Sequence, residues 1–150
     1  MTENPGLDAP LSGNNTVLVV DDVAVVRKAA FRLLSEAGHR VFEAASAAEA
    51  LEVLETARPP VHLVIIDVML PEINGVDLAR LIRDRQPTLP VLFMSAYPAE
   101  VLVREGLDHP NVRFLAKPFT RDELMDKVQT TLRPAPRRTD QQSGIRRPPR

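Results

Sequence analysis

Short apolar runs, each followed by polar residues and then by a helical pattern, constrain the fold of this chain more than any other feature. Residues 16–20, 61–66 and 90–94 are largely apolar and rich in β-branched residues, which is typical of strands buried on both faces. Two further strands are predicted at 40–44 and 112–116. Because strand and helix alternate along the chain, we expect an α/β fold, a doubly wound five-stranded parallel sheet with five helices.

Capping residues predict where several of these helices begin or end. Ser46 with Glu49, and Thr120 with Glu123, have the spacing of a capping box, so helices are expected to follow Ser46 and Thr120. Gly38 follows the apolar pattern of the first helix and predicts its end.

The chain divides into a central domain, 16–132, and two terminal segments. Residues 1–15 and the Arg/Pro-rich residues 133–150 offer little to bury and are expected to be disordered. Six Arg and one Asp give the tail, residues 133–150, a net charge of +5. Because the whole chain has a net charge of −1, residues 1–132 carry a net charge of −6. The tail lacks aromatic residues that stack on bases, so no nucleic acid partner is expected. Whether it is a linker or folds back on the acidic domain stays open.

Composition and motifs exclude several classes of protein. Without cysteine the chain has no disulfide framework, thiolate metal site or thiol nucleophile. No apolar run approaches the roughly 20 residues of a membrane helix, and the N-terminus lacks a signal-peptide pattern, so we expect a soluble cytoplasmic protein without membrane contact. The glycines form no phosphate-binding loop, which disfavours nucleotide binding. His39, His62 and His109 are far apart in sequence and are not expected to bind a metal.

Polar side chains follow four of the predicted strands. They are Asp21 with Asp22, then Asp67, Ser95 and Lys117. Because parallel strands end at one edge of a sheet, these groups are expected to converge there. Crowded carboxylates repel one another unless a cation joins them, and carboxylates suit Mg²⁺. With a lysine and a hydroxyl beside them, they form a set that can position and neutralise a phosphoryl group.

Each of these residues also has an ordinary structural interpretation. Asp21 or Asp22 would serve as the N-cap of the first helix, and Asp67 would begin a turn. Lys117 would be a surface lysine, and Ser95 would bond locally. Their joint occurrence, in order and at strand ends, favours the phosphoryl site.

Four motifs at the predicted strand ends also have a familiar order and spacing: Val-Leu-Val-Val-Asp21-Asp22, Val-Ile-Ile-Asp67 with Pro71 and Gly75, Phe-Met-Ser95-Ala96, and Phe-Leu-Ala-Lys117-Pro118-Phe119. Over residues 16–132 the sequence resembles the response-regulator receiver domains of two-component signalling, the CheY-like superfamily. This resemblance implies a flavodoxin-like sheet with strand order 2-1-3-4-5. The last two motifs look particularly like the terminal receiver domains of hybrid histidine kinases.

The resemblance implies a phosphoacceptor and a metal site. Asp67 would be the nucleophile that forms an aspartyl phosphate. Asp21, Asp22, Asp67 and the backbone carbonyl of Met69 would hold Mg²⁺.

The resemblance also implies residues that contact and report the phosphoryl group. Lys117 would bind a phosphoryl oxygen, and the bond between Lys117 and Pro118 is expected to be cis. Ser95 would move to hydrogen-bond the group, and Phe114 stands at the position of the aromatic switch residue.

Two features depart from the family pattern. Phe114 replaces a frequent Tyr, so no hydroxyl is available there. The segment from Tyr97 to Asn111 is interrupted by Pro and poorly amphipathic, and a fourth helix is expected only as a short one at 98–105. The bulky Met69 and Tyr97 lead to the hypothesis that they restrict attacking water and slow loss of the phosphoryl group.

The implied function is that of a signal receiver rather than an enzyme, apart from slow self-dephosphorylation. A histidine kinase or histidine phosphotransfer protein would donate the phosphoryl group in a phosphorelay, and a downstream protein would read it. Dimerisation on phosphorylation is a further expectation. The chain would be either a stand-alone receiver or the receiver of a hybrid kinase.

Two alternatives stay open. The first is a receiver-like interaction module that works without phosphorylation. The second is a Mg²⁺-dependent phosphohydrolase, but such enzymes usually have a second Asp two residues after the nucleophile, where this chain has Met69.

Overall fold

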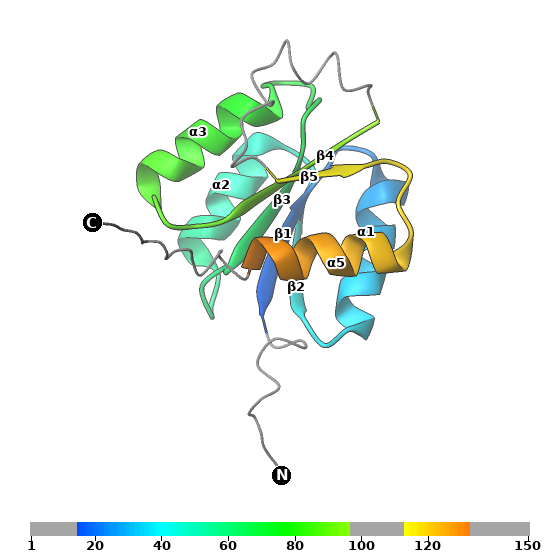
Figure 1. The fold of residues 1–150 in the computed structure, drawn as a ribbon. Coiled ribbons are helices and arrows are strands. Elements are labelled where there is room, and N and C mark those ends of the chain that lie inside the picture. The colour runs from blue at the N-terminus through cyan, green and yellow to red at the C-terminus, as the bar shows by residue number, and fades with distance from the viewer. Residues whose placement is uncertain (1–14, 97–112, 133–150) are drawn as a thin grey trace, which may run out of the picture.

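The computed structural model describes residues 15–96 and 113–132, which form a parallel sheet with helices on both faces (Figure 1). The strands are β1 (Thr16–Val20), β2 (Arg40–Ala44), β3 (Leu63–Asp67), β4 (Val91–Ser95) and β5 (Arg113–Ala116). The described helices are α1 (Ala24–Glu36), α2 (Ala47–Thr56), α3 (Gly75–Arg85) and α5 (Arg121–Leu132). The strand order β2-β1-β3-β4-β5 confirms the predicted topology. The fourth helix expected at 98–105 and both terminal segments expected to be disordered, apart from Asn15, lie outside the described residues.

Alternate residues of the central strands face two separate core layers. In β1, Leu18 and Val20 pack in the layer beneath α2 and α3, whereas Val17 and Val19 pack in the layer beneath α1 and α5. Figure 1 shows these two helix pairs on opposite faces of the sheet. Every residue of β1, β3 and β4 is buried, which is why these segments are apolar at both odd and even positions.

The predicted caps are present. The Ser46 hydroxyl accepts a hydrogen bond from the amide of Glu49 at 3.2 Å. The Thr120 hydroxyl accepts one from the Glu123 amide at 3.1 Å, and the Glu123 carboxylate accepts one from the Thr120 amide at 2.9 Å. Gly38 has a φ of 98°, a left-handed conformation that favours glycine, and it follows Ala37, the C-cap of α1.

Some sequence expectations need correction. Val23, not Asp21 or Asp22, is the N-cap of α1, and no side chain caps this helix. Asp21 instead accepts a hydrogen bond from the Val23 amide at 2.9 Å and so forms the turn into the helix. Strand β3 begins at Leu63 rather than at residue 61, and it includes Asp67 because this residue pairs with Met94 of β4.

His39 is a buried titratable residue at the start of the sheet. His39 follows Gly38 in the sequence and is only 8% exposed. Its Nδ1 has no hydrogen-bond partner within the part of the chain that the structure describes. Burial lowers the pKa of His39 below its usual 6.5, although a hydrogen bond to the backbone of Asn15 acts in the opposite direction.

We therefore predict that acidification destabilises the fold through His39. The unfolded chain binds the proton more tightly, so the stability is complete above pH 6.5 and is lost as the pH falls toward the lower pKa of the folded state. One proton limits the slope to about 1.4 kcal/mol per pH unit. Urea unfolding at several pH values between neutral and mildly acidic should show this slope in the wild type and a weaker one in His39→Leu. Equal slopes for the two proteins would disprove the assignment.

Candidate functional site

The structure brings the predicted polar residues together at the carboxyl edge of the sheet. Asp21 follows β1, Asp67 ends β3, Ser95 ends β4 and Lys117 follows β5. Carboxylate oxygens of Asp21, Asp22 and Asp67 all lie within 4.8 Å of one another. Asp21 and Asp67 are buried, whereas Asp22 is exposed to solvent.

The ammonium group of Lys117 joins the two buried carboxylates. Its Nζ lies 2.8 Å from Asp21 Oδ2 and 3.2 Å from Asp67 Oδ2. The Lys117 side chain is 12% exposed, so both ion pairs are largely shielded from water. Charge-assisted hydrogen bonds of this kind are stronger than neutral ones, and they offset part of the cost of burying the charges.

The environment shifts the pKa values of both partners upward. Burial raises the pKa of Asp67 above its usual 3.8, Lys117 opposes this effect and the charge of Asp21 adds to it. For Lys117, burial acts to lower the pKa, but the hydrogen bond to Asp21 and the charge of Asp67 outweigh it and raise the pKa above 10.5. Lys117 is therefore a permanent cation, while Asp67 holds its negative charge less readily than an exposed aspartate.

Neighbouring residues fix Asp67 and the loop after it. The amide of Met69 donates a hydrogen bond to Asp67 Oδ1 at 3.2 Å, and the Met69 side chain is 42% exposed. Gly75, at the start of α3, donates from its amide to the Val68 carbonyl at 2.7 Å. A Cβ at position 75 would overlap the carbonyl oxygen of Asp67 and lie 2.9 Å from the Cα of Val68. Sequence reasoning treated Gly75 only as part of a loop motif, although it sets how closely α3 approaches the acidic edge.

The other predicted residues lie on the neighbouring strands. Ser95 is buried, and its carbonyl accepts a hydrogen bond from the Lys117 amide at 2.8 Å. The bond between Lys117 and Pro118 is cis, as expected. Phe114 is partly buried, packs against the core layer of α2 and α3, and pairs in register with Phe93. Tyr97 lies outside the described residues.

A second polar cluster adjoins the site and was missed by sequence reasoning. Arg27 of α1 donates a hydrogen bond to the backbone carbonyl of Asp21 and another to Glu43 of β2. No sequence motif marks this pair, since its contact depends on how α1 lies against β2.

No helix among the described residues is long and apolar enough to cross a membrane.

Residues 17–129 match the family profile described as the response regulator receiver domain. A probable transcriptional regulatory protein of Picosynechococcus sp. is 39% identical over 132 residues, which cover 85% of this chain and 53% of that protein. The sensor kinase CckA of Brucella abortus is 38% identical over 122 residues, or 81% of this chain and 13% of that protein. The chain thus spans about half the length, or less, of these relatives.

Solved structures agree with this assignment. The chemotaxis protein CheY4 of Vibrio cholerae superposes with a TM-score of 0.71 at 27% identity, over 79% of this chain and 99% of that one. The receiver domain from the hybrid histidine kinase CckA superposes with a TM-score of 0.65 at 34% identity, over 79% of this chain and all of that one. The second likeness is consistent with the expected resemblance to hybrid-kinase receivers. Receiver domains are signalling modules that work with histidine kinases and downstream targets. This chain belongs to the response regulator receiver domain family of two-component signalling.

Proposed function

We propose that Asp67 accepts a phosphoryl group from a phosphohistidine donor and that the resulting aspartyl phosphate changes the contacts of this domain with a downstream protein. The observation that carries the proposal is the position of Lys117, whose Nζ lies 2.8 Å from Asp21 and 3.2 Å from Asp67. A buried ammonium beside a carboxylate nucleophile provides the positive charge that phosphoryl oxygens require.

Asp67 is suited to act as the nucleophile because both of its carboxylate oxygens are held. Met69 donates to Oδ1, and Lys117 contacts Oδ2. In the transfer, an Asp67 oxygen forms a bond to phosphorus while the P–N bond to the donor imidazole breaks. The electron pair of the P–N bond remains on the imidazole, which leaves as a neutral ring because its other nitrogen carries a proton. Holding the attacking oxygen in one orientation lowers the entropic part of the barrier.

The acidic residues fit a magnesium site. Asp21, Asp22, Asp67 and the backbone carbonyl of Met69 would hold Mg²⁺, because carboxylate and carbonyl oxygens are the ligands that this ion prefers. Asp22 is exposed and leaves room for the water ligands that Mg²⁺ retains. When bound, Mg²⁺ supplies positive charge that reduces the repulsion between the carboxylates and the incoming phosphoryl oxygens.

Lys117, Ser95 and Phe114 are proposed to stabilise and report the phosphoryl group. Phosphorylation removes the carboxylate charge of Asp67 and places charged oxygens beside Lys117, which would then bind one of them. Ser95 lies next to Lys117 at the end of β4 and would donate its hydroxyl to the group. Phe114 of β5 would carry the rearrangement toward the surface.

Exposed apolar side chains around the acidic edge support a protein as the phosphodonor. Val23 is 47% exposed, Val25 is 79% exposed and Met69 is 42% exposed. Val25 and Phe119 also line a shallow groove beside Lys117. Apolar side chains grouped in this way are typical of protein-binding surfaces, and a histidine kinase or histidine phosphotransfer protein is the partner that the chemistry requires. Dimerisation on phosphorylation and a cytoplasmic location remain predictions.

The first prediction of this proposal is a covalent adduct on Asp67. Incubation with a small acyl phosphate and Mg²⁺ should add one phosphoryl group to the wild type and none to Asp67→Ala, as measured by intact mass. Omission of Mg²⁺ should suppress the adduct. A folded wild type that binds Mg²⁺ but forms no adduct would instead indicate an interaction module that works without phosphorylation.

A second prediction concerns the lifetime of the aspartyl phosphate. Met69 is exposed two residues after Asp67, and we propose that Met69 and Tyr97 shield the phosphoryl group from attacking water. Replacing both by Asn should shorten the half-life several-fold in a mass-spectrometric decay assay. Leu81→Asn is the matched control, since Leu81 is equally exposed, at 42%, but lies on α3. Equal decay rates in the wild type and the double variant would rule out the shielding role.

A third prediction concerns the charge of the resting site. Because burial and Asp21 raise the pKa of Asp67, its ionised form is disfavoured by folding. Asp67→Asn should therefore increase the free energy of unfolding at pH 7 without divalent ions, by on the order of 1 kcal/mol. The sign is set by the raised pKa: the gain shrinks as the pH falls and the wild type takes up the proton.

The control for this prediction is Asp77→Asn, which removes an exposed carboxylate of α3 paired with Arg80. It should change the stability by less than about 1 kcal/mol. Addition of Mg²⁺ should stabilise the wild type more than Asp67→Asn. A lower unfolding free energy for Asp67→Asn at pH 7 without Mg²⁺ would contradict the prediction.

A further inference from the structure

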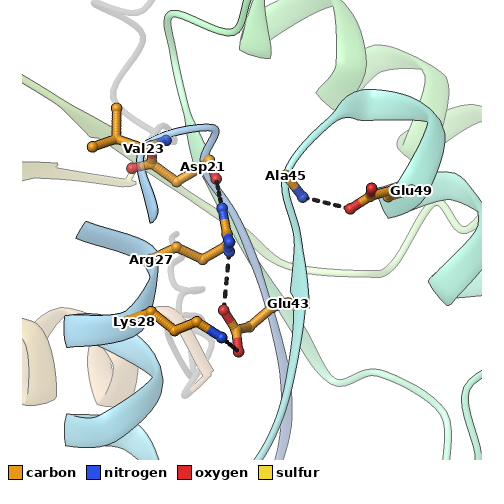
Figure 2. A network of polar contacts seen from close by, with 7 residues as sticks. All are labelled: Asp21, Val23, Arg27, Lys28, Glu43, Ala45 and Glu49. Atoms are coloured by element: carbon orange, nitrogen blue, oxygen red, sulfur yellow. Dashed lines mark hydrogen bonds and ion pairs between the residues drawn. The ribbon is translucent and has the colours of Figure 1, made fainter. Parts of the chain in front are cut away.

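Arg27 links the end of β1 to the neighbouring edge strand. Its Nη1 donates a hydrogen bond to the backbone carbonyl of Asp21 at 2.8 Å, and its Nε donates to Glu43 Oε1 of β2 at 2.9 Å. Figure 2 shows the guanidinium lying between these two acceptors. The Arg27 side chain is only 14% exposed, although it carries a full charge. A cation this well shielded is costly unless its contacts are specific.

The hydrogen bond from Arg27 holds the backbone carbonyl of Asp21, whose other polar atoms are bonded to neighbouring residues. The Asp21 amide donates to the Ala44 carbonyl at 3.1 Å, and its Oδ1 and Oδ2 accept from the Val23 amide at 2.9 Å and from Lys117 Nζ at 2.8 Å. Every polar atom of this fully buried residue therefore has a partner, and Arg27 supplies the one for the carbonyl oxygen. The Asp21 carboxylate is held by the Val23 amide and by Lys117. The Asp21 backbone is held by Arg27 of α1 and by Ala44 of β2.

The residue types suit this task. A guanidinium presents several N–H groups in a fixed planar arrangement, so it can serve two acceptors in different directions at once, whereas an ammonium on a flexible stem is a point charge. The second oxygen of Glu43 accepts a hydrogen bond from the exposed Lys28 Nζ at 3.0 Å. Burial acts to raise the pKa of Glu43, but the hydrogen bonds from Lys28 and Arg27 outweigh it and hold the pKa below 4.5, so this carboxylate is ionised at neutral pH.

We propose that Arg27, oriented by Glu43, is a positioning residue for Asp21, and that it thereby sets both the Mg²⁺ affinity of the acidic edge and the rate of phosphorylation of Asp67. The inference rests on the proposed function. Without Arg27, the Asp21 carbonyl would lose its donor, and the turn from β1 into α1 would be free to shift. Because Asp21 lies on that turn, its carboxylate would shift with it, and small displacements of metal ligands and reacting groups are expensive.

Removal of Arg27 has opposite effects under the two possible roles. If Arg27 acted only through its charge, Arg27→Met would remove a cation that contacts Asp21, a member of the acidic cluster, and would tighten Mg²⁺ binding. If Arg27 positions Asp21, the same variant weakens Mg²⁺ binding. Lys28→Met is the matched control, because Lys28 also pairs with Glu43 but is 64% exposed, and its ammonium bonds Glu43 rather than the Asp21 backbone.

The test is a Mg²⁺ titration of the full chain, followed by the amide chemical shifts of Asp21 and Met69, at a temperature where all variants are folded. Arg27→Met should weaken Mg²⁺ binding by about tenfold. At saturating Mg²⁺ it should also slow the formation of the phosphoryl adduct by about tenfold. Lys28→Met should leave both quantities within about twofold of the wild type. Arg27→Lys should resemble Arg27→Met, since it keeps the charge but not the two-acceptor geometry.

Unchanged or tighter Mg²⁺ binding in Arg27→Met would overturn the positioning role, as would an equal effect of Lys28→Met. If Arg27→Met does not fold, Glu43→Gln decides the question, because it keeps the size of the side chain while it loosens the hold on Arg27. A wild type that binds Mg²⁺ but is not phosphorylated refutes the proposed function and leaves the Mg²⁺ comparison intact. The two failures are therefore distinct.

Discussion

Two buried carboxylates share a single ammonium at the carboxyl edge of the sheet, and the arrangement of the surrounding structure depends on this contact. Asp21 and Asp67 would repel one another in a buried setting, and Lys117 keeps them together. The three residues come from the ends of β1, β3 and β5, so their meeting depends on the strand order β2-β1-β3-β4-β5. A different strand order would separate Asp21, Asp67 and Lys117, so the site requires this sheet topology.

The polar edge is separated from the elements that stabilise the fold. The core layers consist mainly of Val, Leu, Ile and Ala, with Phe93 and Met94, and most of these residues come from the strands and the inner helix faces. The acidic residues, Ser95 and Lys117 stand at or just beyond the strand ends. Short polar links connect the two regions, in particular the bonds that Arg27 and Val23 make to Asp21. Tight packing beneath the edge keeps these links in place without taking part in the chemistry.

Much of this arrangement could be predicted from the sequence because it is encoded locally. Apolar runs identify buried strands wherever both faces are covered, and the residue that follows each run then lies at the edge. Capping boxes at Ser46 and Thr120 are likewise local patterns of hydroxyl and carboxylate. The alternative interpretation of Asp21 or Asp22 as the N-cap of α1 was wrong, because the buried Asp21 carboxylate bonds the Val23 amide and Lys117, and no side chain caps the helix.

Other features are set by contacts between distant segments and have no local signature. The approach of Arg27 to Glu43 depends on the packing of α1 against β2. The buried Nδ1 of His39 depends on what covers the start of the sheet.

Gly75 has a consequence for how this domain changes over evolutionary time. Any side chain at this position would have to displace the backbone of the residue that carries the acceptor carboxylate. Helix α3 can exchange its outward-facing residues freely, as its exposed Asp77 and Arg80 illustrate, but its first residue is bound to the geometry of β3. Substitutions at the exposed positions of the helix can accumulate one at a time, whereas a change at position 75 requires a simultaneous change in the loop after Asp67. Position 75 therefore couples sequence change at the start of α3 to sequence change in the loop after Asp67.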